Sequence, residues 1–283
     1  MNGSARGGAG GLAVLIGSPV AHSLSPAIHR AAFAAAGIDW SYAALEVAEG
    51  RGGEAVEAMR LLGIDGMSVT MPHKTAVADA VDRLEPAARS LRSVNTVSWD
   101  GEELVGSSTD GAGFVASLAE VGIEVASARV AVIGAGGAAR SVIDALGRAG
   151  TSDITVLNRS HEAAERAAQL ATAASVGIVS DVTRADIVVN ATSVGMGVVP
   201  SGATEADLPC APDLLRPEQV VVDLVYHPLR TAWLTAADAV GARTVDGLGM
   251  LIHQAALQQQ HWLGTLPDVA VMRAAAESAL LAR

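Results

Sequence analysis

Lysine is almost absent from this chain of 283 residues, because Lys74 is the only lysine among its 19 lysine and arginine residues. Cysteine is just as scarce: Cys210 is alone, so no disulfide can form within the chain, as expected in a reducing compartment. Aromatic residues make up 3% of the chain, which disfavours base-stacking platforms for nucleic acid. No apolar run approaches the roughly 18 residues that span a bilayer. The sequence therefore predicts a cytoplasmic protein without membrane or nucleic-acid partners.

The remaining composition is typical of a globular enzyme. Half of the residues are hydrophobic, and the length predicts about two domains at roughly 150 residues per domain. The net charge of −11 disfavours a general polyanion binder, although a local arginine cluster can still hold a small anion. The Gly-rich start, residues 1–11, has no long apolar core, so we expect a disordered lead-in rather than a signal peptide.

Short apolar runs alternate with alanine-rich helical stretches, which predicts an α/β fold. Asp100-Gly101 indicates a β-hairpin, so the sheet of the first block is expected to be mixed. Ser25 before Pro26 predicts a helix that Ser25 caps, with Pro at the first helical position. The expected strands of this block are 12–17, 42–47, 66–71, 94–99 and 103–106, and the expected helices are 26–36 and 54–62.

Continuous Val/Ile runs in the second block predict buried parallel strands in a doubly wound sheet. We expect strands over 129–133, 153–157, 187–189 and 220–224, helices over 138–148, 161–173 and 231–240, and a loop over 195–218. The tail is predicted to be helical and to pack back on the first domain. Residues 1–109 and 247–283 would then form a substrate-binding catalytic domain, and residues 110–246 a Rossmann-type NADP-binding domain.

A glycine turn lies between the first strand and helix of the second block. Gly134, Gly136 and Ala139 fit the pattern G-x-G-x-x-G/A, in which small residues allow a tight turn, close approach of a pyrophosphate and close helix packing. The pyrophosphate would lie on the helix N-terminus, where free amides favour an anion. The turn alone is weak evidence, but its strand and helix context predicts dinucleotide binding.

The end of the next strand indicates which dinucleotide binds. Enzymes that use NAD commonly carry a carboxylate about 20 residues after the glycine turn, bound to the ribose 2′-hydroxyl. Here Asn158, Arg159 and Ser160 stand instead, and a guanidinium suits a 2′-phosphate. An ordinary surface arginine is the alternative, but we favour NADP.

Lys74 can release its proton, which a guanidinium cannot, so a positioned Lys74 could shuttle protons at neutral pH. A structural ion pair is the alternative, and for Asp110 a helix cap is the alternative to catalysis. Capping also explains Ser25 well. Asn95 and Gln254 are polar residues in apolar settings, which suggests hydrogen bonds to a polyhydroxylated ligand.

Nine short segments follow one another in order over about residues 12–263: Ser23-Leu24-Ser25-Pro26, Ser68-Val69-Thr70-Met71-Pro72-His73-Lys74, Val94-Asn95-Thr96, Thr109-Asp110-Gly111, Gly134-Ala135-Gly136-Gly137-Ala138-Ala139-Arg140, Asn158-Arg159-Ser160, Asn190-Ala191-Thr192-Ser193, Val225-Tyr226-His227-Pro228 and Asp246-Gly247-Leu248-Gly249-Met250. In this order they resemble the shikimate/quinate dehydrogenase family. Each segment is weak evidence alone, and the ordered set is specific.

The resemblance implies reversible, NADPH-dependent reduction of 3-dehydroshikimate to shikimate on the way to chorismate and the aromatic amino acids. It implies that Lys74 and Asp110 form a catalytic pair. It implies further that the substrate is bound by Ser23, Ser25, Thr70, Lys74, Asn95, Asp110, Tyr226 and Gln254. The NADP site it implies comprises Gly134, Ala135, Gly136, Gly137, Ala138, Asn158, Arg159, Ser160, Asn190, Thr192, Leu224, Gly247 and Met250.

Some questions stay open at this stage. Ser68 and Ser108 depart from the family pattern, which commonly has Asn at both positions. A quinate/shikimate dehydrogenase that uses NAD, a non-catalytic dinucleotide sensor and a paralogue acting on an amino-substituted ring are alternatives. None of the seven histidines has the spacing of a helical zinc site, so no metal is expected. The sequence does not fix the oligomeric state, and a homodimer is compatible with it.

Overall fold

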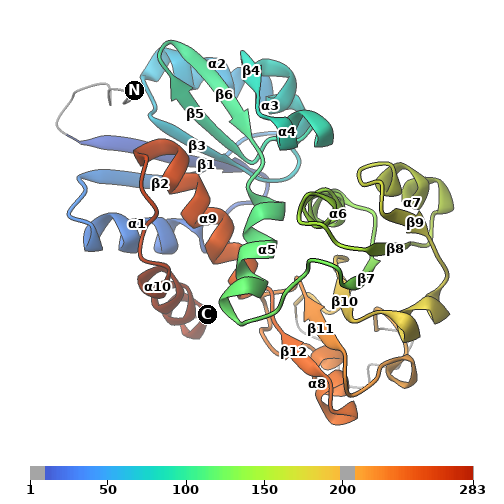
Figure 1. Cartoon of the computed structure of the whole chain (residues 1–283). Helices are drawn as coiled ribbons and strands as arrows, with labels where there is room; N and C mark the ends of the chain where they lie inside the picture. Colours follow the sequence, from blue (N-terminus) through green and yellow to red (C-terminus); the bar gives the residue numbers. More distant parts are fainter. Residues whose placement is uncertain (1–9, 198–207, 283) are drawn as a thin grey trace. The chain divides into compact units, whose positions relative to one another are not determined.

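The computed structural model of the chain describes residues 10–197 and 208–282, which form two compact units (Figure 1). The first unit comprises residues 1–109 and 252–283, and the second comprises residues 110–251. This division falls inside a helix, whereas the boundary predicted from the sequence lies before Gly247. Among the helices of the described ranges, none is long and apolar enough to cross a membrane.

The first unit is built on a mixed six-stranded sheet of order β2-β1-β3-β5-β6-β4. β5 is antiparallel to β3 and β6, and the other neighbouring pairs are parallel. Its strands are β1 Gly11–Gly17, β2 Trp40–Glu46, β3 Gly66–Val69, β4 Arg83–Leu84, β5 Thr96–Asp100 and β6 Glu103–Ser107. Its helices are α1 Ser25–Ala35, α2 Gly52–Leu62, α3 Lys74–Ala80, α4 Pro86–Leu91, most of α9 Leu248–Leu263, and α10 Val269–Leu281.

The second unit is a doubly wound parallel sheet of order β12-β11-β10-β7-β8-β9. Its strands are β7 Arg129–Ile133, β8 Asp153–Leu157, β9 Ala174–Val176, β10 Ile187–Asn190, β11 Val220–Asp223 and β12 Arg243–Val245. Its helices are α5 Asp110–Glu120, α6 Gly137–Arg148, α7 His161–Ala168 and α8 Ala232–Val240, with 3-10 turns η1 Val179–Arg184 and η3 Pro212–Leu214. The chain order of the strands reverses between β7 and β10, which is where such sheets bind ligands.

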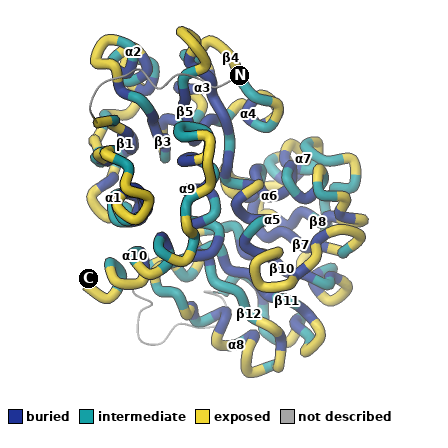
Figure 2. Tube along the Cα trace, turned by 60° about the vertical axis from the view of Figure 1, so that its left-hand side comes forward, coloured by how far each residue is buried: buried dark blue, intermediate teal, exposed yellow. Residues whose placement is uncertain are grey.

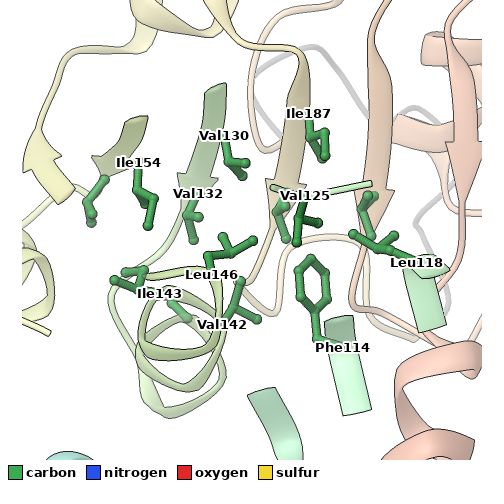
Figure 3. Packing of buried hydrophobic residues seen from close by; sticks show 14 of the residues in the cluster. Phe114, Leu118, Val125, Val130, Val132, Val142, Ile143, Leu146, Ile154 and Ile187 are labelled. Atoms are coloured by element: carbon green, nitrogen blue, oxygen red, sulfur yellow. The ribbon is translucent and has the colours of Figure 1, made fainter. Parts of the chain in front are cut away.

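Buried Val and Ile residues explain why these strands form. In the second unit, Val130, Val132 and Ile154 point from the sheet toward the apolar face of α6, and Phe114 of α5 closes the same core (Figure 3). Coloured by burial, the central strands of both sheets are drawn mostly as buried, and outer helices such as α7 and α8 carry exposed stretches (Figure 2). The α/β class and the mixed and parallel sheets agree with the prediction.

Several predicted details were wrong. Ser25 does not cap α1, because the helix begins at Ser25 and the cap position is Leu24, with no side-chain cap bond. Instead the Ser25 N–H donates to Ser23 Oγ at 3.2 Å. The helix expected over 161–173 ends at Ala168, and Gly11, expected in a disordered lead-in, is the first residue of β1. Residues 1–9 of that lead-in, and 198–207 of the expected loop, lie outside the described residues.

Candidate active site

The glycine turn after β7 has the geometry that a dinucleotide needs. Gly134 has a φ of +119°, and a Cβ there would lie 3.0 Å from the carbonyl oxygen of Ala191. At Gly136 and Gly137 an added Cβ would meet open space. Gly136 is the N-cap residue of α6 and provides no side-chain cap, so the turn exposes backbone amides that suit a pyrophosphate.

Two further expected cofactor residues, Asn190 and Thr192, lie at the same sheet edge. Asn190 ends β10, and its Oδ1 accepts the backbone N–H and the hydroxyl of Thr192 at 3.1 and 2.7 Å. Its Nδ2 donates to the buried carboxylate of Asp223 at 2.8 Å. Burial raises the pKa of Asp223 above its usual range, against the lowering effect of its hydrogen bonds. Asn190 therefore holds the Thr192 loop beside the glycine turn.

The other expected cofactor residues lie in the same unit. A Cβ on Gly247 would lie 2.2 Å from the carbonyl oxygen of Leu224, so only glycine fits against that strand end. Met250 is half-buried against the core of the unit, Ala135 belongs to the turn, and Ala138 lies in the first turn of α6.

The segment after β8 is exposed and carries no carboxylate. Asn158 Nδ2 donates to the carbonyl of Ser160 at 3.0 Å, and Ser160 Oγ accepts the Ala163 N–H at 3.3 Å as the cap of α7. Within the described residues no acidic group pairs with Arg159, so its guanidinium is available to an anion. These residues fit a dinucleotide that carries a 2′-phosphate.

In the first unit, two of the expected substrate ligands, Asn95 and Gln254, belong to one buried cluster. Asn95 Nδ2 donates to Thr109 Oγ1 at 2.9 Å and lies 3.4 Å from Gln254 Oε1. Thr109 Oγ1 also donates to the Gln254 carbonyl at 3.0 Å. The Lys74 carbonyl accepts the N–H of Val94, the residue before Asn95, at 3.0 Å. Asn95, Gln254 and the backbone of Lys74 are therefore held in one framework.

The remaining expected residues are placed as follows. Lys74 begins α3 in the first unit, and Asp110 begins α5 and the second unit; both side chains are half-buried. Ser23 and Thr70 are half-buried in the first unit, and Tyr226 is half-buried in the second, beside the cis His227–Pro228 bond. The pairing of Lys74 with Asp110 and each residue's role toward a ligand stay predictions.

Three buried residues of this framework, Thr109, Ser68 and Gln258, were not predicted as site residues. Thr109 and Gln258 are hydrogen-bonded to Asn95, and Ser68 is hydrogen-bonded to Gln258. The spacing of Gln254 and Gln258, four residues apart on one helix, was the available signal, because such residues share a face. Within the described ranges no group of three metal-binding side chains comes together.

The reversal of strand order, the glycine turn and the second mixed-sheet unit define a two-domain protein with a Rossmann-type nucleotide-binding domain. Sequence comparison identifies the family to which this protein belongs. Models of the shikimate dehydrogenase substrate-binding domain, of shikimate/quinate 5-dehydrogenase and of the shikimate 5′-dehydrogenase C-terminal domain match residues 15–97, 117–226 and 247–277. The chain belongs to the shikimate dehydrogenase family.

Relatives support this assignment over nearly the whole chain. The NADP(+) shikimate dehydrogenase of Moorella thermoacetica is 41% identical over 273 residues, which cover 93% of this chain and 91% of that protein. The Thermus thermophilus shikimate 5-dehydrogenase, solved with NADP(H) and shikimate, has a TM-score of 0.87 at 34% identity, covering 95% of this chain and 99% of that one. The quinate dehydrogenase of Corynebacterium glutamicum, solved with NAD, has a TM-score of 0.85 at 31% identity. The match covers 95% of this chain and 99% of that one.

Proposed function

We propose that this chain is an NADP-dependent shikimate dehydrogenase, which reversibly reduces 3-dehydroshikimate to shikimate in the pathway to chorismate and the aromatic amino acids. The observation that carries the proposal is the family membership of the whole chain, together with a glycine turn followed by Asn158 and Arg159 rather than a carboxylate. A guanidinium recognises a 2′-phosphate in a bidentate manner, which favours NADP over NAD.

When bound, NADPH would supply a hydride to the carbonyl carbon of the substrate. The chain's own residues manage the charge and the proton. Negative charge that develops on the carbonyl oxygen is stabilised by the ammonium of Lys74, which then donates a proton to that oxygen. The carboxylate of Asp110 keeps Lys74 oriented and accepts a hydrogen bond from a ring hydroxyl.

The other residues hold the substrate. The hydroxyls of Ser23, Ser25 and Tyr226 bind its carboxylate, and Thr70, Asn95 and Gln254 bind the ring hydroxyls. The cluster of Asn95, Thr109 and Gln254 supports this assignment, because its amides are already fixed before a ligand arrives, which reduces the entropy lost on binding.

A panel of two substrates and two cofactors tests the proposal. Absorbance at 340 nm should rise fastest with shikimate and NADP, and more slowly with quinate or NAD. A higher rate with quinate and NAD would identify a quinate dehydrogenase, and no rate with any pair would favour a nucleotide sensor without catalysis.

The cellular context belongs to the same proposal. A cytoplasmic location is supported by the single cysteine, Cys210, which is buried and whose pKa burial raises to about 11, so that it stays a thiol. A homodimer is compatible with the sequence, and sedimentation equilibrium of the purified chain would test it.

A further inference from the structure

A chain of buried hydrogen bonds runs through the first unit behind the proposed substrate residues. Ser68 on β3 is 2% exposed and lies 2.8 Å from Tyr42 Oη and 2.8 Å from Gln258 Oε1. Gln258 on α9 is 3% exposed. Because a buried polar atom that lacks a partner destabilises the fold, these contacts constrain one another.

The orientation of the Gln258 amide follows from its neighbours. Its Nε2 donates to the carbonyl of Asn95 at 3.0 Å, which turns Oε1 toward Ser68 and His29. The His29 Nε2 lies 3.2 Å from Oε1, and Gln259 Nε2 lies 3.0 Å from His29 Nδ1. The ring of His29 therefore carries its proton on Nε2, and Gln258 Oε1 accepts two hydrogen bonds.

This orientation sets the direction of the hydroxyl protons. Since Gln258 Oε1 can only accept, Ser68 donates to it and in turn accepts the proton of Tyr42. The oxygen of Tyr42 interacts with the hydroxyl of Ser25 and so places it. When the substrate binds, that hydroxyl turns its proton from Tyr42 to the carboxylate. Ser68, where the family pattern commonly has Asn, both accepts and donates at this point.

The two ends of the Gln258 amide thus lead to the two halves of the proposed substrate site. One end reaches Ser25 through Ser68 and Tyr42. The other end reaches Asn95, whose side chain is bonded to Thr109 and Gln254. An amide side chain suits this place, because its nitrogen donates at one end and its oxygen accepts twice at the other.

We propose that Gln258 is a positioning residue for the substrate, which orients Ser25 toward the carboxylate and Asn95 toward the ring hydroxyls without contacting the substrate. The inference rests on the proposed function. A network that only stabilised the fold would affect the midpoint of thermal unfolding and leave the Michaelis constants unchanged, so kinetics separate the two roles.

The test compares Gln258→Met with Gln260→Met, a matched control because Gln260 is exposed on the same helix. We expect Gln258→Met to raise the KM for shikimate at least about tenfold, with the KM for NADP and kcat changed less than about twofold. The control should match the wild type in all three constants.

A milder variant, Ser68→Ala, interrupts only the branch toward Ser25 and guards against a failure of Gln258→Met to fold. It should raise the KM for shikimate severalfold but leave the KM for the neutral methyl ester of shikimate unchanged. Gln258→Met should raise both of these Michaelis constants. An unchanged KM for shikimate in these folded variants, or an equal rise in the KM for NADP, would overturn the inference. A wild type inactive with shikimate would overturn the proposed function as well.

Discussion

Asn95 and Thr109 are joined by reciprocal hydrogen bonds: Asn95 Oδ1 accepts the Thr109 N–H at 2.9 Å, and Asn95 Nδ2 donates to Thr109 Oγ1 at 2.9 Å. Thr109 is the residue directly before Asp110, the first residue of α5. One amide side chain therefore fixes the backbone from which the proposed catalytic carboxylate projects.

Replacing Asn95 should damage both folding and activity. Asn95→Ala leaves the buried Thr109 N–H without its acceptor, so we expect a loss of about 2 kcal/mol in the free energy of unfolding and at least about 100-fold in kcat/KM for shikimate. Thr109→Val, which keeps that N–H bond, should cost less in both. Urea unfolding and steady-state rates measure the two effects, and equal losses in both variants would contradict this role for Asn95.

The ammonium of Lys74 is expected to act mainly in the transition state. Lys74→Ala should lower kcat at least about 100-fold with a modest change in KM, the pattern of a lost proton donor. Lys74→Arg keeps the positive charge but cannot release a proton readily, so it should be nearly as slow. If Lys74→Arg restored turnover, Lys74 would act through charge alone.

The two glycines of the turn should respond differently to alanine. Gly136→Ala meets open space in the protein, so the midpoint of thermal unfolding should stay constant while the KM for NADP rises at least about tenfold. Gly134→Ala combines a positive φ with a close contact to Ala191, so it should unfold at a lower temperature. Tight NADP binding by Gly136→Ala would place the pyrophosphate elsewhere.

Arg159 is expected to select the cofactor. Arg159→Ala should raise the KM for NADP at least about tenfold and leave the KM for NAD unchanged, because only NADP carries the 2′-phosphate. Arg166→Ala on α7 is the control, since Arg166 is exposed and pairs with Glu162. A parallel rise of both Michaelis constants would mean that Arg159 does not read the 2′-phosphate.

Stability should depend on pH through His29. Burial lowers the pKa of His29 to about 3, against the raising effect of its bond to Gln258. The unfolded chain then binds a proton near pH 6.5 and the folded chain only near pH 3, so stability falls as the pH falls through this window. Between pH 7 and pH 5 the wild type should lose about 2 kcal/mol more than His29→Gln in urea unfolding. Equal losses would show that His29 takes up its proton over the same pH range in the folded and the unfolded chain.

The sequence predicted the strands of the second unit well. The bounds of β7 and β8 agree with the predicted ranges, because continuous Val/Ile runs with clear turns at both ends leave little choice of register. Helix ends were less predictable: α3, which begins at Lys74, was missed, and the end of α7 depends on packing that the local pattern does not contain.

The buried polar residues were the hardest to find. Gln258, Gln259 and Gln260 are consecutive and chemically identical, yet the first two are buried and the third is exposed. Only the partners His29, Ser68 and the Asn95 carbonyl distinguish them, and these come from segments far away in the chain. Spacing alone could relate Gln258 to Gln254 but not show what it binds.

The four tryptophans are divided unequally between the units: Trp40, Trp99 and Trp262 belong to the first, and Trp233 alone to the second. Trp233 is 1% exposed in a core that includes Cys210 and Leu234. Indole emission is sensitive to solvent, so a variant with phenylalanine at the other three positions would give a fluorescence signal for the melting of the nucleotide-binding half alone.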